Sequence, residues 1–388
     1  MNTFDFIKLE KKRQANTVEL IASENFVSQD IMNAVGSCFT NKYAEGFPGK
    51  RYYGGCDVVD GLESYCQHLW QEVFQTDYHV NVQPHSGSNA NLAAYMAVLK
   101  PGDTVLAMDL EAGGHLSHGA KFNISGKLFN FVHYGVDDDG YVDYDDFGRK
   151  LLLYEPKMVV IGASAYSRIL DYAKFNHILD VCEDGGNARP LMMVDMAHVA
   201  GLIAAGLHPS PFGYADIITT TTHKTLRGPR GGMIFCKPEL AKKIDSAVFP
   251  ETQGGPLMHI IAGKAVAAEE ALTVGFQTYQ RQVVANANAM AKEFVNMGYD
   301  VVTGGTDNHM FLIDLSRTHP HLTGKMVQDE LDRHGITLNK NTVPHDQRGP
   351  MQTSGLRIGT PAMTTKGWVE QDFIKCAHDI DAIIGKMK

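Results

Sequence analysis

The sequence predicts an α/β protein whose main domain is built around a large, mostly parallel sheet. Strand-like runs alternate with helical stretches over much of the chain. Several runs are apolar without alternating polar residues, as expected for strands buried on both faces of a parallel sheet. Strand signals then stop at a long Ala-rich stretch and return after it, which predicts a second, smaller C-terminal α/β domain.

The expected elements of the first part follow a short amphipathic start. Strands are predicted at His79–Gln83, Thr104–Met108, Leu128–Tyr134, Met158–Gly162, Leu191–Asp195, Asp216–Thr221 and Gly232–Cys236. Helices are predicted at Asn89–Leu99, Tyr144–Tyr154, Tyr172–Cys182 and Pro238–Ser246. This alternation indicates a doubly wound sheet with right-handed crossovers.

The second part begins with the long helical stretch Met258–Met297. After it we expect strands at Asp300–Val302 and Met310–Asp314, a helix near Gly324–His334, a strand at Gly355–Gly359 and a closing helix. The pattern predicts a boundary near 280–290. We therefore expect an N-terminal arm (1–30), a large domain (31–285) and a small C-terminal domain (286–388).

Composition narrows the class of protein. The chain has 388 residues, with 35 Lys and Arg against 44 Asp and Glu, which gives a net charge of −9. That balance argues against nucleic acid as a partner, because such binding rests on clustered cations. Six scattered cysteines without a C-x-x-C pair, and no apolar segment of membrane-spanning length, predict a cytoplasmic protein that does not enter a membrane.

Lys224 is the first candidate for chemistry. It follows the β-branched run Thr219–Thr222 and precedes a basic, Gly- and Pro-rich turn. A lysine held at a strand end by packed neighbours loses hydration, which lowers its pKa and makes the amine a nucleophile toward aldehydes. The alternative is a surface turn that carries ordinary cations.

Asp195 is the second candidate, at the carboxyl end of an apolar strand. In open α/β sheets ligands bind at that edge, and a poorly solvated acid there needs a cationic partner. A protonated pyridine nitrogen is such a partner. The alternative is an aspartate that caps the following helix.

The third candidate is the segment Gln83–Asn91, in which Ser86, Gly87 and Ser88 open a helix directly after a strand. Backbone N–H groups and the helix dipole at such a point suit a phosphate, although helix capping alone would also favour serine. A phosphate cradle, an acid for a pyridine nitrogen and a lysine for an aldehyde are together the requirements of pyridoxal phosphate. The pair His115-x-x-His118 lacks a third ligand, so no metal site is predicted.

Eight segments, spread in order over almost the whole chain, resemble serine hydroxymethyltransferases. They are Val18–Asn25, Lys42–Gly55, Gln83–Asn91, Gly113–Leu116, Val194–Gly201, Thr219–Gly232, Gln253–Pro256 and Ser354–Pro361. The resemblance implies the type I (aspartate aminotransferase-like) fold of pyridoxal-phosphate enzymes and a homodimer with shared active sites. It also implies tetrahydrofolate as the acceptor of a one-carbon unit.

The resemblance further implies a role for individual residues. Lys224 would bond to the cofactor aldehyde, Asp195 would pair with the pyridine nitrogen, and His115 would stack on the ring. The other cofactor contacts would be Ser86, Gly87, Ser88, Ser164, His198, Thr221, His223, Tyr43 and Gly255. Ser23 and Arg357 would contact the amino-acid substrate, with Arg357 on its carboxylate. Glu45 and Tyr53 would come from the neighbouring subunit, and Glu45 would move a proton at the serine hydroxyl. Leu110, Leu116 and Asn341 would contact folate.

The expected activity is therefore the reversible interconversion of serine and glycine, with the one-carbon unit passed to tetrahydrofolate. The alternative is a folate-independent aldolase that acts on β-hydroxy amino acids such as threonine. It would need the same lysine, aspartate and arginine but not the folate contacts, so those contacts favour the transferase. The complete catalytic set and the acidic charge argue against a non-catalytic, RNA-binding relative.

Overall fold

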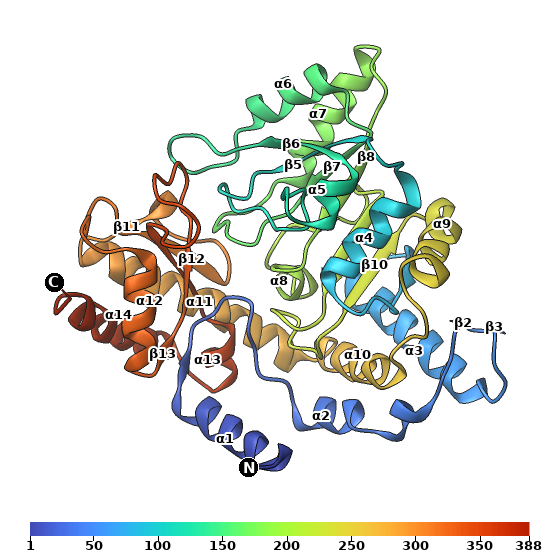
Figure 1. Ribbon diagram of the computed structural model, residues 1–388, viewed down its shortest axis with the longest axis horizontal. Helices are drawn as coiled ribbons and strands as arrows, with labels where there is room; N and C mark the ends of the chain where they lie inside the picture. Colours follow the sequence, from blue (N-terminus) through green and yellow to red (C-terminus); the bar gives the residue numbers. More distant parts are fainter. Residues whose placement is uncertain (388) are drawn as a thin grey trace.

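A seven-stranded sheet forms the centre of the larger lobe of the molecule in a computed structural model, which describes residues 1–387 (Figure 1). Its strand order is β4-β10-β9-β8-β7-β5-β6. These strands are β4 (His79–Asn81), β5 (Thr104–Met108), β6 (Asn130–Tyr134), β7 (Met158–Ile161), β8 (Leu191–Asp195), β9 (Ile217–Thr221) and β10 (Gly232–Cys236). The strands from β5 to β9 run parallel, and β10 is antiparallel to both of its neighbours. The predicted large, mostly parallel sheet is confirmed.

Helices cover both faces of this sheet. One face packs against α3 (Asp57–Phe74), α6 (Tyr144–Tyr154), α7 (Tyr172–Asp184), α8 (Ala200–Ala204) and α10 (Met258–Ala271). The other face packs against α4 (Gly87–Val98), α5 (Ile124–Leu128) and α9 (Ala241–Ser246). Strand β8 shows the reason, because Met192 and Val194 join one buried cluster and Met193 joins the other.

The C-terminal part of the chain forms a second core around a four-stranded antiparallel sheet of order β11-β12-β15-β14. It comprises β11 (Asp300–Val301), β12 (Met310–Asp314), α12 (Gly324–Arg333), β13 (Ile336–Thr337), β14 (Asn339–Asn341), β15 (Gly355–Gly359), α13 (Pro361–Thr365) and α14 (Glu370–Ile384). The helix α11 (Val274–Asn296) joins the two parts: Val283 packs in the first core and Met290 in the second. This change of core supports the predicted division near 285, which stays a prediction; residue 388 of the expected small domain lies outside the described residues.

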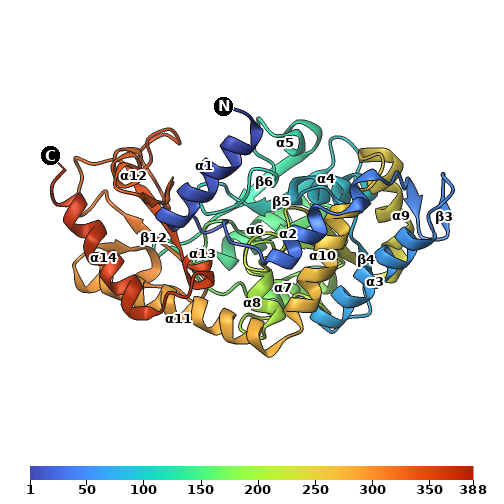
Figure 2. The same cartoon turned by 90° about the horizontal axis from the view of Figure 1, so that it is seen from below.

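The N-terminal segment lies along both domains. It contains α1 (Thr3–Asn16), β1 (Val18–Glu19), α2 (Gln29–Val35) and the short hairpin β2 (Gly46–Phe47) and β3 (Lys50–Arg51). Strand β1 pairs in parallel with β13 of the small domain, and α2 packs against α10 of the large one. Seen from below, α1 crosses the side of the molecule where the two domains meet (Figure 2). The structure of residues 1–387 contains no helix that is both long and apolar enough to span a membrane.

Two of the differences from the sequence prediction concern long helices. The stretch 258–297 is two helices, because the chain leaves the first at Leu272 and the side chain of Thr273 caps the start of α11. The long helix α3 was not predicted at all. Its core-facing side includes Glu63, a fully buried carboxylate that breaks the apolar pattern and pairs with Arg51 at 2.6 Å.

Candidate functional site

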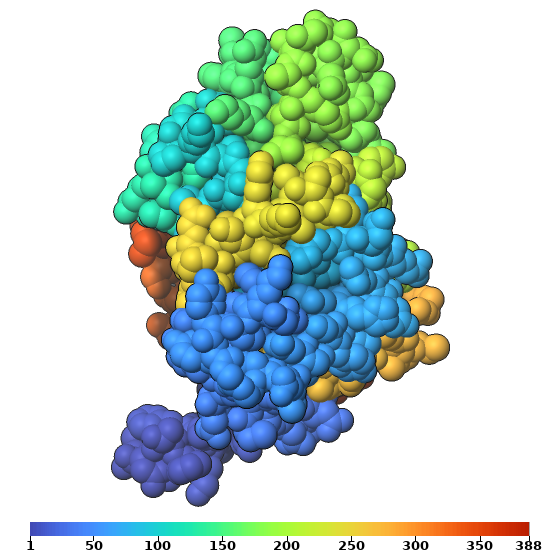
Figure 3. Space-filling model, turned by 90° about the vertical axis from the view of Figure 1, so that its right-hand side faces the viewer, coloured from blue at the N-terminus to red at the C-terminus, as the bar shows by residue number. Residues whose placement is uncertain are grey.

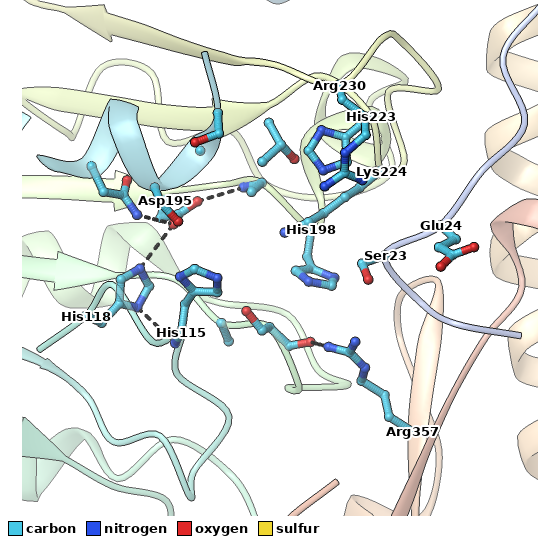
Figure 4. A pocket seen from close by; sticks show the side chains of 18 residues that line it. Ser23, Glu24, His115, His118, Asp195, His198, His223, Lys224, Arg230 and Arg357 are labelled. Carbon is cyan, nitrogen blue, oxygen red and sulfur yellow. Dashed lines mark hydrogen bonds and ion pairs between the residues drawn. The ribbon is translucent and has the colours of Figure 1, made fainter. Parts of the chain in front are cut away.

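A cavity of about 440 Å³ opens at the carboxyl ends of β8 and β9, where the two domains meet (Figure 4). The start of α4 and the strand β15 complete its walls. Twelve of the predicted site residues line it: Ser23, Ser86, Gly87, Ser88, His115, Ser164, Asp195, His198, Thr221, His223, Lys224 and Arg357. Segments far apart in the sequence therefore meet in one place.

Lys224 sits on a tight loop that follows β9. The Thr225 hydroxyl fixes the loop, since it donates to the carbonyl of His198 at 2.8 Å and accepts from the Gly201 N–H at 3.0 Å. The amine is almost fully buried. Burial lowers its pKa to about 8, the cations Arg357 and Arg230 act in the same direction, and Asp195 opposes them. The loop therefore presents an amine that loses its proton readily and can attack a carbonyl carbon.

Asp195 is held by three hydrogen bonds at the end of β8. Its Oδ2 accepts from Asn91 Nδ2 at 2.9 Å and from His118 Nε2 at 3.1 Å, and its Oδ1 accepts from the Ala197 N–H at 3.1 Å. His118 presents Nε2–H because its Nδ1 accepts from the His115 N–H at 3.3 Å. Burial alone would raise the pKa of Asp195, but the hydrogen bond from His118 and the nearby cation Lys224 hold it below its usual value. The carboxylate stays ionised inside the protein.

Sequence reasoning did not find Asn91 as a partner of Asp195, and it treated His118 only as half of a metal pair. Both ring nitrogens of His118 are engaged by protein groups, so its chemistry here is that of a hydrogen-bond donor. Asn91 lies one helical turn after Ser88 and so faces the same cavity, a spacing that could have signalled its role.

The start of α4 suits a phosphate group. Gly87 approaches β9 so closely that a Cβ there would lie 2.6 Å from Thr221 Cγ2. Ser86 caps the helix, because its hydroxyl accepts from the Asn89 N–H at 3.3 Å, so the capping alternative is correct for that side chain. Two buried polar atoms that line the cavity, Thr221 Oγ1 and His223 Nδ1, have no partner in the described part of the protein. A bound phosphate with its acceptor oxygens fits these groups.

Two imidazole rings border the space between these groups. Burial lowers the pKa of His115 to about 4, so its ring is neutral, and its Nδ1 lies 2.7 Å from Ser117 Oγ. The Nδ1 of His198 lies 3.2 Å from Nε2 of the fully buried His309. Burial and then the cations Lys224 and Arg357 lower the pKa of His198. Both rings can pack against an apolar or aromatic group without bringing in charge.

Arg357 reaches the cavity from β15 of the small domain. Its Nε donates to Asn339 Oδ1 at 3.1 Å and one terminal nitrogen donates to the Ser164 carbonyl at 2.7 Å. Burial lowers its pKa to about 10. Its hydrogen bonds within residues 1–387 go to neutral oxygens and not to a carboxylate. A partly buried guanidinium without a carboxylate is suited to bind an anionic group of a ligand.

The remaining predicted residues lie outside this cavity. Tyr43, Glu45, Tyr53 and Gly255 form a second group on the surface: the rings of Tyr43 and Tyr53 are 5.2 Å apart, the Tyr43 hydroxyl lies 3.3 Å from Glu45 Oε1, and a Cβ on Gly255 would lie 3.4 Å from the Tyr43 ring. Leu110 and Leu116 are partly exposed, and Asn341 lies on β14 beside the strand of Arg357.

Two comparisons with known proteins bear on this site. A family model described as serine hydroxymethyltransferase matches residues 1–380. A curated serine hydroxymethyltransferase from Halorhodospira halophila is 56% identical over 383 residues, which cover 98% of this chain and 90% of that relative. Neither similarity supports the folate-independent aldolase. The chain belongs to the serine hydroxymethyltransferase family, and it interconverts serine and glycine with pyridoxal phosphate and passes the one-carbon unit to tetrahydrofolate.

Proposed function

We propose that the cavity at the ends of β8 and β9 holds pyridoxal phosphate and that Lys224 bonds covalently to its aldehyde carbon. One observation carries this assignment: a readily deprotonated amine, an ionised carboxylate and two unpartnered polar atoms converge on one cavity of about 440 Å³. When bound there, the cofactor supplies a protonated pyridine ring that accepts electron density from the substrate.

Asp195 keeps the proton on the pyridine nitrogen. Its Oδ2 accepts from Asn91 and His118 and its Oδ1 from the Ala197 N–H alone, so Oδ1 has the greater free acceptor capacity and would accept from the ring nitrogen. His115, His198 and Ser164 line the same cavity: His115 would cover one face of the ring as a neutral imidazole, and His198 and Ser164 would lie near the phenolic oxygen. The hydrogen bonds that hold Asp195 would orient the cofactor through its ring nitrogen.

The phosphate binds at the start of α4. Backbone N–H groups of Gly87 and Ser88 donate to it, Ser86 caps the helix behind it, and the free atoms Thr221 Oγ1 and His223 Nδ1 complete the shell. The close contact of Gly87 with Thr221 leaves no room for a side chain at position 87. This anchor would hold the cofactor in place independently of its bond to Lys224.

The substrate carboxylate binds Arg357, whose planar fork matches two carboxylate oxygens. The guanidinium is partly buried and has no carboxylate partner among the described residues, so a bound substrate carboxylate would supply the missing counter-charge. Ser23 lies at the same end of the cavity and contacts the bound amino acid. Leu110, Leu116 and Asn341 contact folate at the mouth.

A homodimer completes the site in this proposal. Tyr43, Glu45, Tyr53 and Gly255 lie together but outside the cavity of their own chain, so they serve the cavity of a second copy. Glu45 then moves the proton of the serine hydroxyl. The helix α1 also supports an intersubunit role, because it buries none of its side chains and projects from the body of the molecule (Figure 3). A partner chain would cover its exposed apolar residues Phe4, Phe6, Ile7 and Leu9.

A cytoplasmic location and the three-part division (1–30, 31–285, 286–388) belong to the same proposal. The six cysteines are all unpaired, and five are buried, which suits a reducing compartment. The change of core along α11 supports the boundary at 285.

The covalent role of Lys224 is tested by reduction with borohydride. The wild-type protein should retain the reduced cofactor covalently, and Lys224→Ala should not. A reduced link that persists in Lys224→Ala would overturn the assignment.

The folate contacts are tested by absorbance spectra of the glycine complex. Glycine plus tetrahydrofolate should produce a strong long-wavelength band that glycine alone produces weakly. Substituting Asn341 by alanine should require more tetrahydrofolate for the same band. Equal spectra with and without folate would contradict the proposed folate site.

Shared sites are tested by mixing two inactive variants, Lys224→Ala and Glu45→Gln. Hybrid dimers then contain one site with both defects and one intact site. The mixture should recover about one quarter of wild-type activity after subunit exchange, because half of the dimers are hybrids. No recovery in a mixture shown to contain hybrids would place Glu45 in its own chain's site.

A further inference from the structure

A second buried lysine lies beneath the proposed phosphate site. Lys264 projects from α10 into the large domain and is 1% exposed. Its ammonium donates to the carbonyls of Val82 at 2.6 Å, Gly232 at 2.8 Å and Pro84 at 3.1 Å. These bonds use all three N–H donors, so the group is held in its protonated form. The charge is balanced by carbonyl dipoles and not by a bonded carboxylate.

The three carbonyls belong to the two segments that build the phosphate site. Val82 and Pro84 lie in the link from β4 to Ser86, and Gly232 begins β10. These segments touch: the Gly232 N–H donates to the Pro84 carbonyl at 3.0 Å, and a Cβ on Gly232 would lie 3.0 Å from the Gly87 nitrogen. Lys264 therefore joins the link that leads into the phosphate-binding turn to the strand that follows the Lys224 loop.

The packing around Lys264 leaves little freedom for another arrangement. A Cβ on Gly231 would lie 2.5 Å from Lys264 Cε, and a Cβ on Gly263 of the same helix would lie 3.1 Å from Pro229 Cγ. Helix α10 thus lies directly against the loop that carries the site. A shift of the ammonium would move both the link and the loop.

The positive charge of Lys264 reaches groups in the site. It is among the charges that lower the pKa of His223, after burial, Arg230 and Lys224, and with burial it lowers the pKa of His85. Burial lowers the pKa of Lys264 itself to about 8, and the neighbouring Cys66 and Glu63 act against that shift. The same positive charge of Lys264 would attract a dianionic phosphate bound at the start of α4.

We propose that Lys264 is a positioning residue for the cofactor phosphate: its ammonium fixes the carbonyls of Val82, Pro84 and Gly232, aligns the turn at Ser86–Gly87, and supplies a buried positive charge beneath the phosphate. The inference rests on the phosphate site proposed above and assigns this lysine a part in it. Lys264 touches neither substrate nor cofactor in this assignment and acts through the backbone and the field.

The test compares the binding of pyridoxal phosphate and of pyridoxal, which lacks the phosphate, to apoprotein by equilibrium dialysis. Lys264→Met keeps the stem and removes the charge and the donors. It should weaken pyridoxal phosphate binding by about tenfold or more, as for a lost charge-assisted contact, while pyridoxal binding changes by less than about twofold. Equal weakening of both ligands, or no change in either, would overturn the proposal.

Two controls separate the possible failures. Asn286→Leu removes a buried amide that bonds Thr364 and the Trp368 carbonyl in the small domain, a comparable loss far from the phosphate. It should leave the ratio of the two affinities unchanged. Thr221→Val removes the free hydroxyl of the proposed phosphate shell and should lower that ratio if the phosphate binds at α4. An unchanged ratio in Thr221→Val refutes the phosphate site itself, whereas a change there without one in Lys264→Met refutes only the role of Lys264.

A folding check accompanies each variant. Thermal unfolding of the apoproteins shows whether Lys264→Met is folded, and Lys264→Gln, which keeps a donor but no charge, replaces it if it is not. The glutamine variant should show the same selective loss of pyridoxal phosphate binding. Failure of both variants to fold would show that the lysine serves the fold as a whole and would overturn the positioning role.

Discussion

Replacing Asp195 by asparagine tests the centre of the proposed site with almost no change in shape. Both carboxylate oxygens act as acceptors: Oδ2 for Asn91 and His118, and Oδ1 for the Ala197 N–H. An amide has one acceptor end and one donor end. In either orientation, the NH₂ group of the substituted side chain faces an N–H donor of the protein, and the ring nitrogen loses the anion that keeps it protonated.

The structure allows the size of each effect to be stated. A buried donor left without an acceptor costs about 1–3 kcal/mol, so Asp195→Asn should lower the free energy of unfolding of the apoprotein by about that amount. The loss of an ionic group aimed at developing charge lowers turnover by about 100-fold or more. Cofactor affinity should fall less, because the bond to Lys224 and the phosphate contacts remain.

Asp216→Asn provides a matched control on the same sheet. Asp216 precedes β9 and also uses both oxygens, which accept from the Met192 N–H at 2.8 Å and from Lys237 Nζ at 2.7 Å. It does not line the cavity. In urea unfolding both variants should lose stability, but in a serine-cleavage assay only Asp195→Asn should lose turnover. Full turnover in Asp195→Asn, or an equal loss in both variants, would refute the reasoning.

Charge and burial lead to three further predictions. Because burial lowers the pKa of Lys224 to about 8, stopped-flow capture of pyridoxal phosphate by apoprotein should accelerate with pH and level off above about pH 8; a rate still rising at pH 10 would contradict this. Arg357→Lys keeps the charge but loses the planar fork, so KM for serine should rise about tenfold or more with a smaller change in kcat. Burial and the neighbouring Glu24 raise the pKa of Glu19 to about 7, above its ordinary 4.5. Between these two values Glu19 is protonated in the folded state and ionised in the unfolded state, so the free energy of unfolding falls as the pH rises from about 4.5 to about 7. Glu19→Gln should remove that fall and exceed wild type by about 1–3 kcal/mol in urea unfolding at pH 8, but match it near pH 4; an unchanged pH profile would exclude Glu19 as the cause.

The strands of the large sheet were predictable because burial on both faces demands unbroken apolar residues. Thr104–Met108, Leu191–Asp195 and Gly232–Cys236 have the bounds that the sequence predicts. Helix α3 was not predictable in this way, since its buried Glu63 is stable only through Arg51 and Gln83, which lie elsewhere in the chain. A periodic pattern of apolar residues shows which residues share one face of a helix or strand. It does not show which residues of distant segments that face will contact.

The chemical groups at the strand ends were predictable for a related reason. A parallel sheet places the carboxyl ends of its strands at one edge, so Asp195 and Lys224 were expected to meet there. Their environment was not predictable. The hydrogen bonds of Asn91 and His118 to Asp195 span 104 and 77 residues, and no local pattern encodes them.

The sequence by itself determined the sheet, the acid and amine at its edge, the glycine-containing turn before α4 and the family. These features depend on the types of residues that are close together in the sequence, so they could be predicted without knowing which distant segments pack together. Only the tertiary structure decided that Asp195 accepts from two distant side chains at Oδ2 and from one backbone N–H at Oδ1, that Arg357 has no carboxylate partner among the described residues, and that Lys264 bonds the link that leads to the turn before α4. Such contacts depend on which distant segments pack together, and their free energies arise only once folding has removed the water between them.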